Sequence, residues 1–83
     1  MGKVICSYCG STWYVENDHY RAYNRGGVTV VPSCRACNRS KSDKTPAEWL
    51  DYLKENDPYR FRRIVQHQKG RRSPFAKLVR YRR

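Results

Sequence analysis

The sequence predicts a small α+β domain, in which a zinc-stapled β-hairpin and helix are followed by basic C-terminal helices. Two Cys-x-x-Cys pairs, Cys6/Cys9 and Cys34/Cys37, enclose a β-branched and aromatic segment. Three later segments each place a capping side chain directly before a proline, a pattern typical of helix starts. The chain has 83 residues, so its core is small and a metal staple is expected to help hold it together.

The first half of the chain predicts short strands that end at a helix. Residues 2–10 are expected to form a short strand leading into the first cysteine turn. Residues 12–18 are β-branched and aromatic, which favours a second strand. The Arg-Gly-Gly run at 25–27 indicates a turn, and residues 28–31 predict a third short strand. We expect the last two strands to form a β-hairpin and the segment from Cys34 onward to become helical.

The second half predicts three helices, over residues 46–55, 58–68 and 74–82. They begin after Thr45, Asp57 and Ser73, and Glu48 completes a capping box with Thr45. The expected buried residues are Trp49, Leu50 and Leu53 in the first helix, Phe61, Ile64 and Val65 in the second, and Phe75, Leu78 and Val79 in the third. We also expect the aromatic residues Trp13, Tyr14 and Tyr52 to lie in the core.

The cysteines predict one structural zinc ion ligated by Cys6, Cys9, Cys34 and Cys37. The alternative is a secreted miniprotein with two disulfides. The first residues show no apolar signal-peptide core, and no stretch is long and apolar enough to span a membrane. We therefore expect a cytoplasmic protein, in which paired cysteines favour zinc.

The positive charge is concentrated at one end of the chain. Residues 1–58 carry eight Lys/Arg and seven Asp/Glu, whereas residues 59–83 carry ten Lys/Arg and no acid. Such a block attracts polyanions, and nucleic acid is preferred over an anionic membrane because the apolar residues are spaced as in helices. We divide the chain into a zinc-stapled core, 1–57, and a basic helical DNA-binding extension, 58–83. Residues 71–83 are expected to be dispensable for folding.

Several motifs occur together in a recognisable order. After the first cysteine pair come Asp-His-Tyr at 18–20, Arg-Gly-Gly at 25–27 and VPSCRACNRSK at 31–41. This set resembles the HNH endonucleases of the ββα-metal group, over residues 6–53. In that family an Asp-His pair ends the first strand, two glycines follow the histidine at these offsets, and the last motif residue directly follows the last cysteine. The resemblance implies a ββα-metal fold and metal-dependent cleavage of DNA. Small stand-alone proteins of this family are frequent in phages and bacteria.

The resemblance assigns catalytic roles to residues that a thiolate zinc site does not use. Phosphodiester hydrolysis needs a base for water and positive charge on the phosphate. His19 is the expected base. Asp18 and Asn38 are expected to hold a catalytic divalent cation, Mg²⁺ or Mn²⁺. Taken singly, His19 could be structural and Asn38 a helix cap, but the ordered set favours catalysis.

The chain departs from the family pattern at one position. The family usually has a middle asparagine five residues before the third zinc cysteine, where this chain has Thr29. The threonine hydroxyl could still support the loop behind the catalytic histidine.

The expected partner is DNA, and no membrane is expected. The residues expected to contact DNA are Arg21, Arg25, Arg39, Lys41, Arg60, Arg62, Arg63, Lys69, Arg71 and Arg72. Two other interpretations remain: a non-catalytic zinc module that binds DNA or RNA through its basic segment, and a ribosome-associated zinc protein. Neither makes use of Asp18, His19 and Asn38 together.

Overall fold

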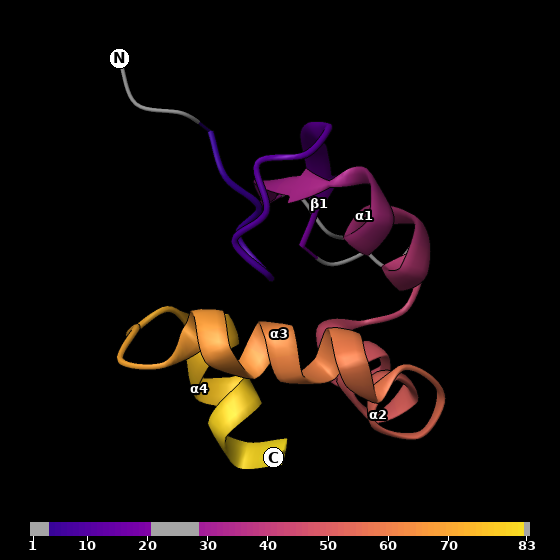
Figure 1. Cartoon of the computed structure of the whole chain (residues 1–83), viewed down its shortest axis with the longest axis vertical. Coiled ribbons are helices and arrows are strands. Elements are labelled where there is room, and N and C mark those ends of the chain that lie inside the picture. Colours follow the sequence, from indigo (N-terminus) through magenta and orange to yellow (C-terminus); the bar gives the residue numbers. More distant parts are fainter. Residues whose placement is uncertain (1–3, 21–28, 83) are drawn as a thin grey trace.

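The structure, a computed structural model, describes residues 4–20 and 29–82. They form two strands and four helices, with the bounds β1 Val15–His19, β2 Val30–Cys34, α1 Arg35–Lys41, α2 Pro46–Asn56, α3 Pro58–Gln68 and α4 Pro74–Arg82. The hairpin and α1 lie on one side of the molecule, and α2, α3 and α4 are grouped on the other (Figure 1). The predicted α+β class, a β-hairpin followed by helices, is confirmed.

The two strands form an antiparallel hairpin whose register runs from Val15 opposite Cys34 to His19 opposite Val30. The first strand begins later than predicted because Tyr14 has a left-handed backbone, with φ of 48°, which an extended strand does not contain. The second strand runs beyond the predicted end and includes Pro32. A two-stranded sheet has no central strand, so a proline is tolerated there.

The strand predicted over residues 2–10 is wrong for its described part, residues 4–10. This segment is a loop that closes on itself around the first cysteine pair, with Gly10 N donating to Cys6 O at 3.0 Å and Cys6 N donating to Ser11 O at 2.7 Å. It is joined to the hairpin instead by Ser7 N, which donates to Pro32 O at 2.8 Å. The N–H and C=O groups that would pair with a neighbouring strand therefore form hydrogen bonds within the cysteine turn.

The three later helices match the predicted ranges to within one residue, because their capping signals are local. Glu48 N donates to Thr45 Oγ1 at 3.1 Å and Thr45 N donates to Glu48 Oε1 at 2.9 Å, which completes the capping box. Asp57 and Ser73 cap the next two helices in the same way, through one side-chain oxygen each. Among the helices of residues 4–20 and 29–82, none has both the length and the apolar character that a membrane crossing needs.

One apolar core joins the helices to the cysteine loop. Tyr8, two residues after Cys6, is buried at its centre, and its ring meets those of Trp49 and Phe75 at centroid distances of 5.1 and 4.9 Å. The predicted core residues Leu50, Leu53, Ile64 and Val79 are buried in the same cluster as the cysteines. Phe61, Val65 and Leu78 are partly buried against it.

Three aromatic residues that we expected in the core lie at the surface. Trp13 is 72% exposed, Tyr14 59% and Tyr52 42%, so the expectation was wrong for them. Trp13 and Tyr14 precede β1, at the end of the hairpin that carries Cys34, and the interior beside the cysteines is filled by Tyr8 instead.

The basic C-terminal helices belong to this core. Gln68 at the end of α3 donates from Nε2 to Ser7 O at 2.7 Å and to Tyr8 O at 2.8 Å. In α4, Phe75 and Val79 are buried. This packing argues against the expectation that residues 71–83 are dispensable for folding, because their removal would expose the core beside Tyr8. The division at residue 57 falls between α2 and α3, and buried residues on both sides of it share one cluster.

Candidate metal centre and the residues around it

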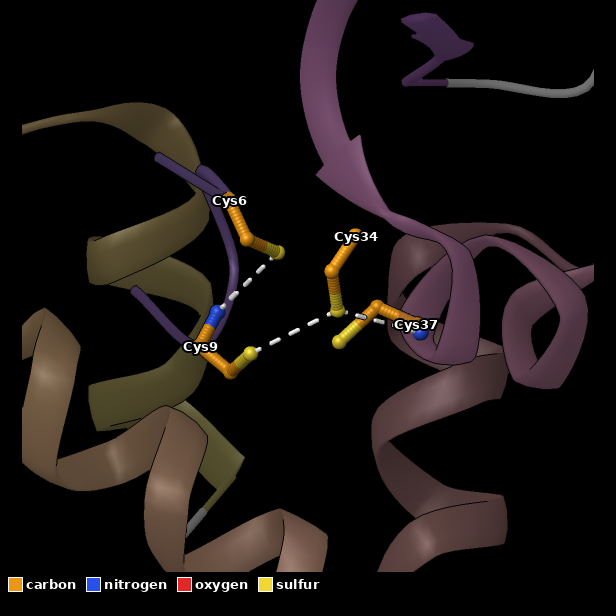
Figure 2. A group of neighbouring side chains, drawn as sticks. All are labelled: Cys6, Cys9, Cys34 and Cys37. Atoms are coloured by element: carbon orange, nitrogen blue, oxygen red, sulfur yellow. Dashed lines mark hydrogen bonds between the residues drawn. The ribbon is translucent and has the colours of Figure 1, made fainter. Parts of the chain in front are cut away.

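The four cysteine side chains meet between the first loop and α1. Their sulfur atoms point toward a common centre (Figure 2). All four Sγ atoms lie within 4.8 Å of one another, and Cys9 Sγ is 3.7 Å from Cys34 Sγ. Tetrahedral zinc with Zn–S bonds of about 2.3 Å would hold its sulfur atoms about 3.8 Å apart. The cluster therefore has the size and the ligands to hold a metal ion such as zinc.

The same distances exclude the disulfide alternative in this structure. A disulfide needs sulfur atoms about 2.05 Å apart, and all four cysteines are free thiols. All four are also buried, so the sulfur atoms face one another and not solvent.

Backbone amides surround the sulfur atoms as they do in zinc knuckles. Cys6 Sγ accepts from Tyr8 N at 3.4 Å and from Cys9 N at 3.5 Å. Cys34 Sγ accepts from Cys37 N at 3.4 Å. Each Cys-x-x-Cys turn thus supplies donors to its own first cysteine. Such donors stabilise a sulfur atom in its thiolate form.

Arg60 on α3 adds a positive charge from outside the two turns. Its Nη1 donates to Cys37 Sγ at 3.3 Å, and its Nε lies 3.5 Å from Asp57 Oδ2. Burial lowers the pKa of Arg60, but the charge and the hydrogen bond of Cys37 outweigh it, so the pKa is raised. Four thiolates around a divalent ion leave a net negative charge, which this guanidinium partly offsets.

The cysteines shift one another's pKa values in opposite directions. A hydrogen bond from Cys37 is the main cause that lowers the pKa of Cys6, and the resulting thiolate at Cys6 is the main cause that raises the pKa of Cys37. The pKa of Cys9 rises to about 11: Cys37 lowers it, but Cys6 and burial raise it more. One cysteine therefore loses its proton readily, and its negative charge opposes the deprotonation of the others. A bound cation would be needed to hold all four as thiolates.

Asp18 and His19 end β1, as the sequence predicted. The Asp18 carboxylate is 8% exposed. Tyr8 Oη donates to its Oδ2 at 2.8 Å, and Lys41 Nζ lies 3.3 Å from the same oxygen. Burial, together with the charge of Asp18, raises the pKa of Tyr8, so its hydroxyl stays protonated and can donate. Among the described residues both of these contacts use Oδ2, which leaves Oδ1 as the oxygen for another ligand.

Asn38 lies on α1 and faces β1. Its Nδ2 donates to Glu16 Oε1 at 3.1 Å. Side chains two apart on a strand share a face, so Glu16 and Asp18 point to the same side of the hairpin. The structure therefore brings Asn38 to the strand that carries Asp18 and His19, with Glu16 as the direct contact.

Lys41, which we expected to contact DNA, is instead buried. Its side chain is 0% exposed, and besides the ion pair with Asp18, Nζ donates to His19 O at 2.9 Å. The DNA-contact prediction for Lys41 is contradicted by this burial. Lys41 is four residues after Cys37, so both lie on the inward face of α1. In this structure Lys41 connects α1 to β1 through its ion pair with Asp18 and its hydrogen bond to the His19 carbonyl.

The other residues expected at DNA differ in their exposure. The exposed ones are Arg39, Arg62, Arg63, Lys69, Arg71 and Arg72. Arg60 is partly buried against Cys37. Arg21 and Arg25 lie outside the described residues. Thr29 is exposed, and its carbonyl oxygen accepts from Tyr20 N at 2.8 Å, so its described contribution to the loop is made by the backbone.

Sequence reasoning missed Glu16 and Tyr8, and it assigned Arg60 to DNA without its contact to the cysteines. Glu16 contacts Asn38, Tyr8 holds Asp18, and Arg60 contacts Cys37. The spacing of Glu16 and Asp18 in Glu-x-Asp-His could have indicated two carboxylates on one face of a strand. Nothing local in the sequence connects Tyr8 or Arg60 to their partners, which are ten and twenty-three residues away.

Comparison with protein-family models, with curated proteins and with solved structures yields no match. The resemblance to HNH endonucleases thus depends on the ordered motifs of the sequence alone.

We predict that the purified protein contains one zinc ion per chain and needs it to fold, because metal binding supplies folding free energy in small thiolate domains. Elemental analysis should give this stoichiometry. Chelation should expose four reactive thiols and reduce the helical circular dichroism. A metal-free protein with two disulfides by mass would contradict the prediction.

We predict that Lys41→Met lowers the free energy of unfolding by about 3 kcal/mol or more, because it leaves the Asp18 carboxylate buried without its cation. The control is Arg39→Ala, an exposed position on the same helix, with an expected change under about 0.5 kcal/mol. Urea unfolding followed by circular dichroism measures both. Equal losses in the two variants would show that the ion pair does not stabilise the fold.

Proposed function

We propose that this chain is a metal-dependent DNA endonuclease that hydrolyses phosphodiester bonds, with structural zinc in the four-cysteine cluster. The observation that supports this most is the attachment of α1 to its surroundings. Cys37 joins α1 to the cluster and Lys41 joins it to Asp18 and His19. Asn38 lies between these two attachments and faces β1.

In this proposal His19 accepts the proton from the attacking water. Its position at the partly exposed end of β1 gives solvent and substrate a way to reach it. Lys41 holds the backbone of His19 through its carbonyl oxygen. A fixed backbone would limit the positions that the imidazole can take during the reaction.

The oxygen atoms on the face of β1 that carries Asp18 suit a hard divalent cation. Asp18 Oδ1 and Asn38 Oδ1 are the proposed ligands, because their partner atoms Oδ2 and Nδ2 are already used by Lys41 and Glu16. Glu16 is a further carboxylate on this face. Mg²⁺ or Mn²⁺ bound here would place positive charge on the scissile phosphate and stabilise the leaving oxygen.

A second function is favoured by one specific observation. The Asp18 carboxylate is buried and paired with Lys41, which is a structural use that requires no catalysis. A non-catalytic zinc module would keep this pair and bind DNA or RNA through exposed arginines. The two proposals differ in whether phosphodiester bonds are broken.

We predict that His19→Ala abolishes cleavage of supercoiled plasmid in Mg²⁺ or Mn²⁺ while DNA affinity and zinc content stay unchanged, because only the base is removed. The matched control is Asn17→Ala, at an exposed position earlier on the same strand, which should cut like the unmodified protein.

Asn38→Ala should weaken the response to Mg²⁺ more than it weakens DNA affinity. It is a cleaner test than Asp18→Ala, which would also leave Lys41 buried without its partner. Cleavage by His19→Ala at the unmodified rate would refute the assigned base. A protein that never cuts with either cation would favour the binding module.

We predict that glutamine at five exposed positions, Arg62, Arg63, Lys69, Arg71 and Arg72, weakens DNA binding and its salt dependence. Each phosphate that is no longer neutralised by a side chain should reduce the slope of log affinity against log salt by about 0.9. Fluorescence anisotropy over a range of salt concentrations measures this slope. Lysine at the four arginine positions is the charge-conserving control. An unchanged slope in the glutamine variant would place the DNA-binding surface elsewhere.

A further inference from the structure

We propose that Trp13 and Tyr14 form a stacking platform for an unpaired nucleobase, so that this protein binds single-stranded DNA beside the cysteine cluster. The proposal rests on the proposed function in one respect, the choice of DNA as the partner. It adds a site and a form of DNA that the catalytic residues do not specify.

The two rings are exposed and support each other. Trp13 and Tyr14 meet edge to face, with ring centroids 5.3 Å apart. The guanidinium carbon of Arg35 lies 4.8 Å from the centroid of the Tyr14 ring. Tyr14 is thus contacted by Arg35 and by Trp13, whereas Trp13 keeps 72% of its surface exposed. A large aromatic surface held in place by neighbours is what base stacking requires.

The backbone fixes this pair at an energetic cost. Tyr14 has φ of 48°, a left-handed conformation that a bulky aromatic residue rarely adopts. Two hydrogen bonds hold the turn: Arg35 N donates to Tyr14 O at 2.9 Å, and Trp13 N donates to Ser11 Oγ at 3.0 Å. The turn therefore orders two exposed aromatic side chains that the core does not use.

The surroundings of Trp13 are basic and hollowed. Trp13 lines an open hollow of about 300 Å³, together with Ala36 of α1 and the side chains of Arg60 and Arg63 of α3. Arg63 and Arg35 are exposed. A base stacked on Trp13 would therefore have guanidinium groups near its phosphates, the combination typical of single-strand sites.

Charge decides among the possible occupants of this surface. A second copy of the chain, with its net charge of +11, would bring like charge to a surface bordered by arginines. A DNA strand brings the opposite charge, and any base offers a ring to stack. A base pair inside a duplex does not expose its ring faces, so a single strand fits the platform and the body of a duplex does not.

The zinc-loaded full-length protein allows a direct test, because its two tryptophans differ in exposure. Trp49 is 0% exposed, so changes in tryptophan emission on DNA binding report mainly on Trp13. The probes are an oligothymidine of about twelve nucleotides and a blunt duplex of equal length, without added divalent cation. We expect the single strand to quench the emission and the duplex to leave it nearly unchanged.

Substitutions then test the contribution to affinity. Trp13→Ala should weaken binding of the single strand about tenfold and change duplex binding less than about twofold. Trp13→Phe should retain most of the affinity, because it keeps an aromatic ring. The control is Tyr81→Ala on α4, where an aromatic residue that is 91% exposed lies between Arg80 and Arg82. It should change neither affinity.

Several outcomes would overturn the proposal. They are unquenched emission in the saturated single-strand complex, equal losses of single-strand and duplex affinity in Trp13→Ala, or an equal single-strand loss in Tyr81→Ala. The emission measurement uses the unmodified protein, so it stands even if Trp13→Ala fails to fold. Failure of plasmid cleavage would refute the endonuclease and leave these binding results standing, so the two proposals fail separately.

Discussion

The meeting of four buried sulfur atoms is the constraint on which the rest of the structure depends. It joins the loop that carries Cys6 and Cys9 to the end of β2 and the start of α1. Tyr8 follows Cys6 by two residues and enters the core, while Asn38 directly follows Cys37 and faces β1. The position of the core aromatic and that of the proposed cation ligand are thus both set by their neighbouring cysteines. Loss of the cluster would release both at once.

The short helix α1 combines a structural face with a proposed catalytic one, and this creates a conflict of charge. Lys41 holds α1 against Asp18, but its ammonium group, 3.3 Å from the carboxylate, also repels any divalent cation that Asp18 would bind. Cation affinity in the free protein should therefore be weak. Phosphate oxygens of bound DNA would add ligands and negative charge, so cation and DNA would bind more tightly together than either alone.

Most features that depend on residues close together in the sequence were predicted correctly, and several features that depend on distant residues were not. The helices after Thr45, Asp57 and Ser73 were predictable because each cap bonds a residue three positions away. The cysteine cluster was predictable from spacing, because thiolates have few other uses in such pairs. The burial of Lys41 was not, since it depends on Asp18, a residue far away along the chain. The exposure of Trp13 was also not predictable, because Tyr8 occupies the space in the core that an aromatic residue from this region could fill.

Helical periodicity allows the C-terminal segment to serve the core and carry charge at the same time. In α4, Phe75, Ala76 and Val79 face inward, while Lys77 and Arg80 are exposed. The positive charges of α3 and α4 are therefore carried on ordered helices packed against the cysteine loop, and not on a free arm. A surface that is ordered before binding loses less conformational entropy when a polyanion binds to it. The same packing keeps these charges at a fixed distance from the hairpin, so any DNA they hold is presented to β1 and α1 in a limited range of orientations.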